Sequence, residues 1–401
     1  MGLPASRAPR ILSPVSAPLD NAEILRRLVG FDSVSRNSNL PIADFISEAL
    51  DRPGIRIQRQ RSPDGTKANL IVEAGPPVDP ATREGLVLCG HMDVVPAEEP
   101  EWRSDPFELV EQEGRFIGRG SADMKGFLAL AMQRIMATDP SRLTKPLVLL
   151  FTYDEELGCI GAHHFAEHWP KPETLPRNVV IGEPTSMRAV RTHKGHLKLK
   201  LTVLGTTAHS GYPHLGHNAI EPMARAITAL SALRERLAKE RAESSADFPE
   251  VPFVALNIGM INGGVAVNVV PDRCDVDIGM RVLPGMSSDA LIDRVRETVT
   301  PVLQGERWSL DLAGDSPPFL LGADRPVFRD LTHMLQQTDE ASIAFATDAG
   351  WLQTAGFDCV VCGPGDIAVA HKPNESLSIA EFNAADRFLE TLVLRATGAG
   401  A

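Results

Sequence analysis

Two histidines and four acidic residues follow apolar runs or glycine-rich turns along the chain. They are His91, Asp123, Glu155, Glu156, Glu183 and His371. Short continuous apolar runs are typical of buried strands in α/β proteins, and such sheets place ligand sites at the carboxyl ends of their strands. We therefore expect these side chains to meet at one edge of one sheet. Imidazole and carboxylate ligands without cysteine suit Zn²⁺, Co²⁺ or Mn²⁺, so the sequence predicts a catalytic site that holds two metal ions.

Each of these residues, taken singly, has a simpler interpretation. His91 could be a loop histidine, Asp123 could cap the helix that follows it, and the carboxylates of 154–156 could form a solvated acidic loop. Residues i and i+2 of an extended chain share a face, so Asp93 could accept a hydrogen bond from one nitrogen of His91 and leave the other nitrogen for a metal. The repeated position after successive strands favours the metal site over these separate alternatives.

The elements that must position these residues change character in the middle of the chain. Leu86–Cys89, Leu147–Phe151 and Val179–Ile181 are continuous apolar runs, which indicate strands covered by helices on both sides. His196–Val203 instead alternates polar and apolar residues, which indicates a strand with one solvent-exposed face in an antiparallel sheet. From about 194 to 314 the predicted order is β-α-β-β-α-β, the ferredoxin-like pattern.

The predicted fold class is therefore α/β, a two-domain chain in which a catalytic sheet with helices on both faces is interrupted by a ferredoxin-like insertion. Helical patterns separate the strands before the insertion, and α/β signals resume near Val360. The expected boundaries are a flexible N-terminal tail over 1–20, the first catalytic part over 21–193, the insertion over 194–314 and the second catalytic part over 315–401.

Charge and composition exclude several classes of partner. Among 401 residues, 40 Lys and Arg stand against 52 Asp and Glu, a net charge of −12, so the chain lacks the basic surface that nucleic acid or an anionic membrane requires. No apolar run approaches the length of a membrane span. Five cysteines argue for a reducing compartment, and the CxxC of Cys359 and Cys362 lies in a predicted buried strand. Residues 1–20 lack the apolar stretch of a signal peptide, so we expect a cytoplasmic protein.

Six motifs in chain order give the sequence a family resemblance. They are GHMDVVP, GRGSADMKG, TYDEE, IGEPTS, TAHSGYP and AHKPNE. Together they resemble the M20 metallopeptidase family from about residue 20 to the C-terminus. The resemblance implies hydrolysis of an N-acyl amino acid by a catalytic domain with two divalent ions, Zn²⁺ or Co²⁺. It also implies a homodimer, with the inserted domain serving dimerisation or closing the site as a lid.

The resemblance assigns metal-site roles to individual residues. The implied ligands are His91 and Glu183 on one ion, Glu156 and His371 on the other, and Asp123 bridging both. Glu155 resembles the general base, which takes a proton from a water acidified by metal and passes it to the leaving amine. Asp93 is expected to assist catalysis by orienting His91, as the spacing of the two residues suggests.

Three further residues resemble substrate contacts of the family, and a fourth is a candidate because a cationic substrate requires an acidic partner. His209 resembles the lid-domain histidine that reaches the partner subunit's site and stabilises the tetrahedral oxyanion, with a surface loop histidine as the alternative. Asn268 and Arg281 resemble the groups that hold the substrate's carboxylate, a role that suits the planar fork of arginine, although an exposed sheet arginine is the alternative. Asp348 is a candidate acceptor for a substrate ammonium, with a helix cap as its alternative.

Within the family, IGEPTS, ATDAGWLQTAG and GPGDIAVAHKPNE resemble most the branch that hydrolyses N²-acetyl-L-ornithine to L-ornithine and acetate in arginine biosynthesis. Asp366, Val369 and Asn374 depart from that branch, where Ser, Gln and Asp are commoner. One alternative is another amide hydrolase of the family, such as succinyl-diaminopimelate desuccinylase or an aminoacylase. Another is a non-catalytic binding protein on the same fold, which loss of Glu155 or of a metal ligand would favour, yet all six positions are filled.

Overall fold

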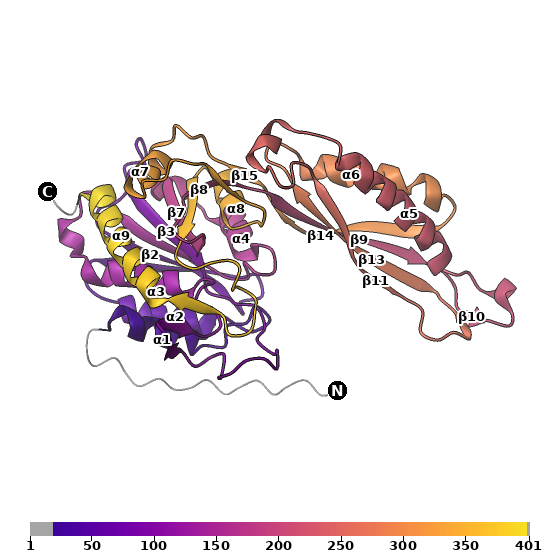
Figure 1. Ribbon diagram of the computed structural model, residues 1–401, viewed down its shortest axis with the longest axis horizontal. Coiled ribbons are helices and arrows are strands. Elements are labelled where there is room, and N and C mark those ends of the chain that lie inside the picture. Colours follow the sequence, from indigo (N-terminus) through magenta and orange to yellow (C-terminus); the bar gives the residue numbers. More distant parts are fainter. Residues whose placement is uncertain (1–18, 399–401) are drawn as a thin grey trace. The chain divides into compact units, whose positions relative to one another are not determined.

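The structure is a computed structural model that describes residues 19–398, so most of the N-terminal tail expected over 1–20 lies outside the described residues. The chain divides into two compact units (Figure 1). The first unit runs to Arg191 and includes Leu321–Ala341 and the residues from Thr347 onward, and the second comprises Thr192–Leu320 with Ser342–Ala346. The insertion expected over 194–314 lies wholly within the second unit.

The first unit is built on the strands β1-β2-β6-β3-β7-β17-β8 of a large sheet, and the short strands β15 and β16, at the boundary between the units in the chain, pair with β8. The strands are β1 Ile55–Arg61, β2 Ala68–Ala74, β3 Leu86–His91, β6 Leu147–Thr152, β7 Asn178–Pro184, β8 Val190–His193, β15 Phe319–Leu320, β16 Ala341–Ile343 and β17 Asp358–Gly363. The central strands β6, β3, β7 and β17 pair in parallel. Every residue of β3 and β6 is buried, which explains their unbroken apolar sequences.

Two groups of helices pack on this sheet. The first group is α1 Asn21–Val29, α2 Leu40–Leu50, α3 Lys125–Ala137 and α9 Ile379–Thr397, and the second is α4 Ile160–His168, α7 Pro326–Met334 and α8 Ala349–Thr354. Helix α3 is buried along almost its whole length and contacts β3, β6 and β7. Short segments complete the unit: β4 Val110–Gln112, β5 Arg115–Ile117, β18 Ser376–Ser378 and the 3₁₀ turns η1 Pro140–Arg142 and η2 Pro172–Thr174.

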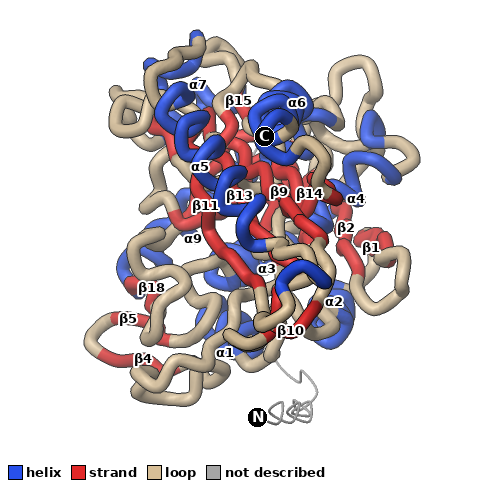
Figure 2. Tube along the Cα trace, turned by 90° about the vertical axis from the view of Figure 1, so that its right-hand side faces the viewer, coloured by secondary structure: helices blue, strands red, loops and turns tan. Residues whose placement is uncertain are grey.

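The second unit is an antiparallel sheet in the order β11-β13-β9-β14 with two helices beside it, α5 and α6 (Figure 2). These elements are β9 Gly195–Leu204, α5 Ile220–Leu237, β11 Ala255–Gly263, β13 Arg273–Val282, α6 Ser288–Val299 and β14 Arg307–Ser316. Alternate residues of β9 and β13 are buried and form one core with α5 and α6. With the first and third main strands in the centre, this is the predicted ferredoxin-like pattern. The remaining short elements are β10 Ala208–His209, η3 Pro213–Leu215, η4 Glu243–Asp247, β12 Val269–Val270 and η5 Pro301–Leu303.

Together these elements confirm the predicted mixed α/β fold class. Across residues 19–398, no helix is both long enough and apolar enough to cross a bilayer.

Candidate metal centre

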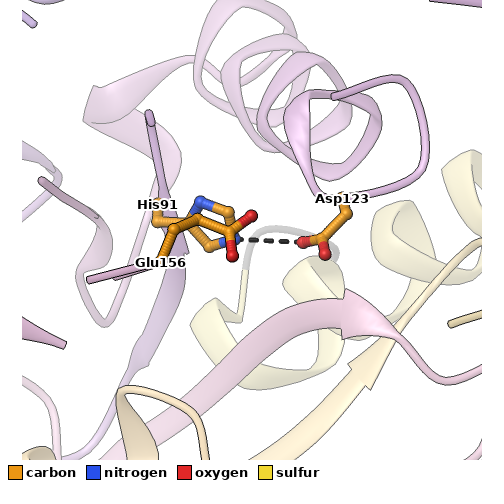
Figure 3. Close-up of side chains that lie close together, drawn as sticks. All are labelled: His91, Asp123 and Glu156. Carbon is orange, nitrogen blue, oxygen red and sulfur yellow. Dashed lines mark hydrogen bonds and ion pairs between the residues drawn. The ribbon is translucent and has the colours of Figure 1, made fainter. Parts of the chain in front are cut away.

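The first unit brings three of the predicted ligands together (Figure 3). His91 ends β3, Asp123 lies in the turn before α3, and Glu156 follows β6. The Nε2 atom of His91 lies 3.1 Å from Oδ1 of Asp123, and one ligand atom from each of the three side chains lies within 4.8 Å of the others. Because β3 and β6 are parallel neighbours, their carboxyl ends deliver these side chains to the same edge of the sheet.

The carboxylate of Asp123 lies between two imidazoles. Its Oδ2 atom is 3.3 Å from Nε2 of His371, while its Oδ1 atom faces His91. His371 is also 3.1 Å from Oε1 of Glu156, and His91 is 3.9 Å from Oε1 of Glu183 at the end of β7. This arrangement can hold two cations. Asp123 would bridge them, and each cation would have one histidine and one further carboxylate beside it.

The donor atoms of this cluster fit divalent transition metals. All are imidazole nitrogens and carboxylate oxygens, the ligands that catalytic Zn²⁺ or Co²⁺ sites use. The Nδ1 atom of His91 lies 2.9 Å from the backbone carbonyl of Asp93, which places the proton on Nδ1 and leaves the Nε2 lone pair for a metal. His371 is half exposed, so the cluster is open to solvent on one side.

The structure differs from the expected role of the Asp93 carboxylate. This carboxylate lies 3.7 Å from the His91 ring, farther than the backbone carbonyl of the same residue. Its oxygens instead accept hydrogen bonds from the backbone N–H groups of Glu155 and Glu156, at 3.1 and 3.3 Å, and from the hydroxyl of Ser35 at 2.7 Å. Asp93 therefore orients His91 through its backbone and holds the turn of the two glutamates through its side chain.

The electrostatics of the cluster favour cations. Burial, reinforced by neighbouring carboxylates, raises the pKa of Glu155, Glu156 and Glu183. Burial opposes ionisation of Asp123 as well, yet its hydrogen bonds with the two imidazoles hold its pKa below the usual range. The same bonds from Asp123 and Glu156 raise the pKa of His371 to about 10. Carboxylates outnumber imidazoles in a confined space, so either protons or divalent ions must balance their charge.

Comparison with known proteins places this cluster in a family. Residues 87–395 match Peptidase family M20/M25/M40. The chain belongs to the M20 family. It is 36% identical to the acetylornithine deacetylase of Proteus mirabilis (strain HI4320) over 370 residues, which cover 89% of this chain and 92% of that relative.

Two solved structures show the same fold as this M20 chain. An M20 family metallo-carboxypeptidase from Sulfolobus solfataricus matches with a TM-score of 0.76 at 17% identity, over 94% of this chain and 99% of that one. A dinuclear metal-binding peptidase of the M20 family from Bacillus subtilis matches with a TM-score of 0.64 at 13% identity, over 94% and 98% of the two chains.

A buried glutamate supports the Asp123 turn of this M20 chain. Glu375 is 1% exposed, and its two oxygens accept backbone N–H groups of Gly120, Ala122 and Asp123 at 2.9 to 3.0 Å. Its Oε2 atom also accepts a hydrogen bond from Nη1 of Arg119, itself 1% exposed, at 2.8 Å. The sequence prediction named no role for Glu375, although it ends the AHKPNE motif. Its partners lie more than 250 positions away in the sequence, so no local sequence pattern indicates the contact.

We expect Glu375→Ala to lower the free energy of unfolding by about 3–5 kcal/mol, because it leaves the Arg119 guanidinium buried without its charge partner. Glu99→Ala is the matched control, since Glu99 is 37% exposed and lies 3.7 Å from the same guanidinium. An exposed pair of this kind contributes at most about 1 kcal/mol. Urea unfolding of both variants measures the difference, and equal losses would contradict the supporting role.

The structure places Asp348 differently from the expected ammonium acceptor. Asp348 is 1% exposed, and its Oδ2 atom accepts a hydrogen bond from Thr152 at 2.6 Å. It stands at the cap position of α8 without a side-chain capping bond, and it lies near Glu155 and Cys159. Burial raises its pKa to about 6. A carboxylate without open surface does not suit a charged substrate group, so we do not retain this role.

The three remaining predicted residues lie in the second unit, outside the cluster that the first unit builds. His209 is exposed on β10, whose pairing with β12 brings it beside the loop of Asn268, and the Asn268 carbonyl accepts the N–H of Ser210 at 2.9 Å. Arg281 is half buried on β13 and pairs across the sheet with His196 of β9. Their roles in binding substrate stay predictions.

Proposed function

We propose that this M20 chain hydrolyses the amide of N²-acetyl-L-ornithine to give L-ornithine and acetate. The observation that carries the proposal is the Asp123 carboxylate between His91 and His371, with Glu155 near His91 and Glu183. The substrate follows from the 36% identity to an acetylornithine deacetylase over most of both chains. The five cysteines are all buried thiols, which supports a cytoplasmic location.

The proposed ligands are His91 and Glu183 for one ion, Glu156 and His371 for the second, and Asp123 for both, with Zn²⁺ or Co²⁺ as the metal. The dinuclear M20 peptidase of the same fold supports the number of ions. When bound, such ions polarise the amide carbonyl and lower the pKa of water.

Glu155 is the proposed proton carrier of the reaction. One of its oxygens lies within 4.8 Å of ligand atoms of His91 and Glu183, close enough to receive the proton of the attacking water. Burial raises its pKa, which suits a group that must first accept a proton and then give it to the leaving nitrogen. The backbone hydrogen bond to Asp93 holds its turn in place.

Arg281 is the proposed partner of the substrate's carboxylate, together with Asn268. Burial lowers the pKa of Arg281, and burial with the charges of Arg281 and Lys198 lowers the pKa of His196 to about 4. Arg281 therefore keeps a positive charge beside a neutral His196, an arrangement that suits an anionic group of a substrate.

We expect Arg281→Ala to lower kcat/KM by about 10- to 100-fold, because charge-assisted hydrogen bonds contribute roughly 1.5–3 kcal/mol. Arg273→Ala on the same strand is the control, since Arg273 is exposed and bonded to Asp275. Steady-state kinetics on N-acetylornithine measure both variants. Equal kinetics for the two would remove Arg281 from the substrate site.

A homodimer is the proposed assembly, with His209 acting on the oxyanion in the partner's site. β11 is an edge strand of the second unit's sheet, and Met260 and Ile261 on it are more than half exposed. Val265 and Val267 in the loop after β11 are almost fully exposed. An open edge with apolar side chains favours pairing with a second copy. Gel filtration at micromolar concentration should give twice the subunit mass.

The substrate assignment is tested with a panel of amides. The Co²⁺- or Zn²⁺-loaded protein is offered N-acetylornithine, N-acetylmethionine, N-acetylcitrulline and N-succinyl-diaminopimelate, and we expect the highest kcat/KM for N-acetylornithine. A tenfold preference corresponds to about 1.4 kcal/mol in transition-state binding. If another compound is preferred by that margin, the chain is a different amide hydrolase of the family.

A further inference from the structure

We propose that Glu155, Cys159 and Asp348 form a third cation site, which binds a thiophilic divalent ion and inhibits hydrolysis by engaging Glu155. The inhibitory part rests on the proposed role of Glu155 as the base. None of the three belongs to the proposed ligands of the two catalytic ions. The site would make an excess of the activating metal an inhibitor.

The three donor groups lie close together in the structure. The Sγ atom of Cys159 lies 3.4 Å from Oε1 of Glu155, and one ligand atom from each of the three side chains lies within 4.8 Å of the others. Zinc–sulfur and zinc–oxygen bonds of about 2.3 and 2.1 Å at a tetrahedral angle separate sulfur from oxygen by roughly 3.6 Å. The observed sulfur–oxygen distance therefore needs only a small adjustment to accept an ion.

Two packed helices support this geometry. Glu155 and Cys159 lie in the segment between β6 and α4, with Cys159 at the cap position of α4, and Asp348 holds the corresponding position of α8. Helices α4 and α8 pack against each other, so the two starts are held together. Cys159 and Asp348 are thus held at the starts of two packed helices, and Glu155 lies in the short connection before one of them.

Asp348 supplies an independent reason to expect a cation. Among residues 19–398, its Oδ1 atom is buried and has no hydrogen-bond partner, while Oδ2 is bonded to Thr152 at 2.6 Å. A buried carboxylate oxygen without a partner is costly unless a proton or a cation compensates it. Burial raises the pKa of Asp348 to about 6, so near neutral pH most of this carboxylate is ionised and can accept a cation.

Sulfur distinguishes this site from the catalytic cluster. The cluster has only nitrogen and oxygen donors, whereas a thiolate favours Zn²⁺, Cd²⁺ or Co²⁺ over Mg²⁺ and Mn²⁺. On binding, the S–H bond of Cys159 breaks, its proton passes to solvent, and the thiolate sulfur bonds to the ion. A Glu155 oxygen bonded to that ion no longer accepts a proton from water.

The test is an anaerobic Co²⁺ titration of the full chain, with bound ions counted by equilibrium dialysis and absorption recorded in the near ultraviolet. The first two equivalents should bind without a thiolate-to-cobalt charge-transfer band, and the third should bring that band. Hydrolysis of N-acetylornithine should fall at least tenfold between two and three equivalents. Cys274→Ala, which removes a buried thiol of the second unit, should behave as the unmodified chain does.

The Cys159→Ala variant should bind only two Co²⁺ ions and show no charge-transfer band. When Co²⁺ is added beyond two equivalents, its rate of hydrolysis should fall by less than twofold from the rate measured at two equivalents. The Asp348→Asn variant keeps an acceptor for the Thr152 hydroxyl and should also bind the third ion more weakly. It tests the site independently if Cys159→Ala does not fold. The proposal is overturned by a third ion without the band, by a band that persists in Cys159→Ala, or by a third ion that leaves hydrolysis unchanged. The chain could bind the third ion and show the band without hydrolysing the amide. That result would contradict the proposed function and support the third cation site.

Discussion

Replacing Glu155 by Gln is expected to lower kcat by about 10³-fold while both catalytic ions stay bound. The amide has the size of the carboxylate and keeps its backbone N–H bond to Asp93, so the turn should hold its shape. It has no site of suitable basicity for the proton of the attacking water, and it cannot return a proton to the leaving nitrogen. Catalysis that remains would come from polarisation of the carbonyl and from substrate binding.

Glu167→Gln provides the matched control for this change. Glu167 lies on α4, which begins five residues after Glu155, and its exposed side chain pairs with His163 and His168. Single-turnover kinetics and metal counting on both variants separate loss of the proton carrier from loss of metal. A Glu155→Gln variant that keeps its ions and more than a tenth of kcat would assign the proton transfer to another group.

The architecture could be predicted because it depends on local periodicity. Continuous apolar runs located β3, β6 and β7, and strict alternation located β9 and β13, since a strand covered on both faces and a strand with one wet face have different sequence periods. Helices α3 and α4 separate the strands before the insertion, as the helical patterns predicted. The gathering of His91, Glu156 and Glu183 could be anticipated because these residues lie at or after the ends of parallel strands, whereas Asp123 lies in the turn before α3.

The finer contacts could not be predicted because they join residues far apart in the chain. Thr152 and Asp348 are 196 positions apart in the sequence. Their hydrogen bond holds Asp348 in the interior, whereas the sequence suggested a contact with the substrate. The spacing of His91 and Asp93 correctly suggested a contact, but not that the carbonyl would be the acceptor. Which atom of a side chain faces a neighbour depends on packing in three dimensions, which a one-dimensional pattern does not contain.

The cooperation between Asp123 and Glu375 shows how such distant contacts matter for the site. The backbone of the 120–123 turn is held by Glu375 from the C-terminal part of the chain, while the Asp123 side chain faces the two histidines. Neither oxygen of Asp123 is needed to hold the turn, so both are available to cations. Because the Asp123 side chain does not hold the turn, replacing it should have little effect on the conformation of the turn.

Asp123→Asn is therefore expected to reduce tightly bound ions from two to at most one and to lower kcat by more than about 10³-fold. An amide presents one oxygen and one N–H₂ group, so it can accept a bond from only one side, and its donor side repels a cation. Loss of the negative charge also leaves His91 and His371 without their shared acid, and their pKa values should fall because that acid raises both.

Asp139→Asn is the control for Asp123→Asn, since Asp139 is exposed and its side chain accepts hydrogen bonds from Ser141 in its own local turn. Equilibrium dialysis counts the bound ions, and a spectrum of the Co²⁺-loaded protein reports their ligands independently of activity. Two ions bound by Asp123→Asn with unchanged affinity would show that this carboxylate does not bridge them. The shared oxygen pair would then have to come from Glu156 or Glu183, and the roles proposed for His91 and His371 would have to be reassigned with it.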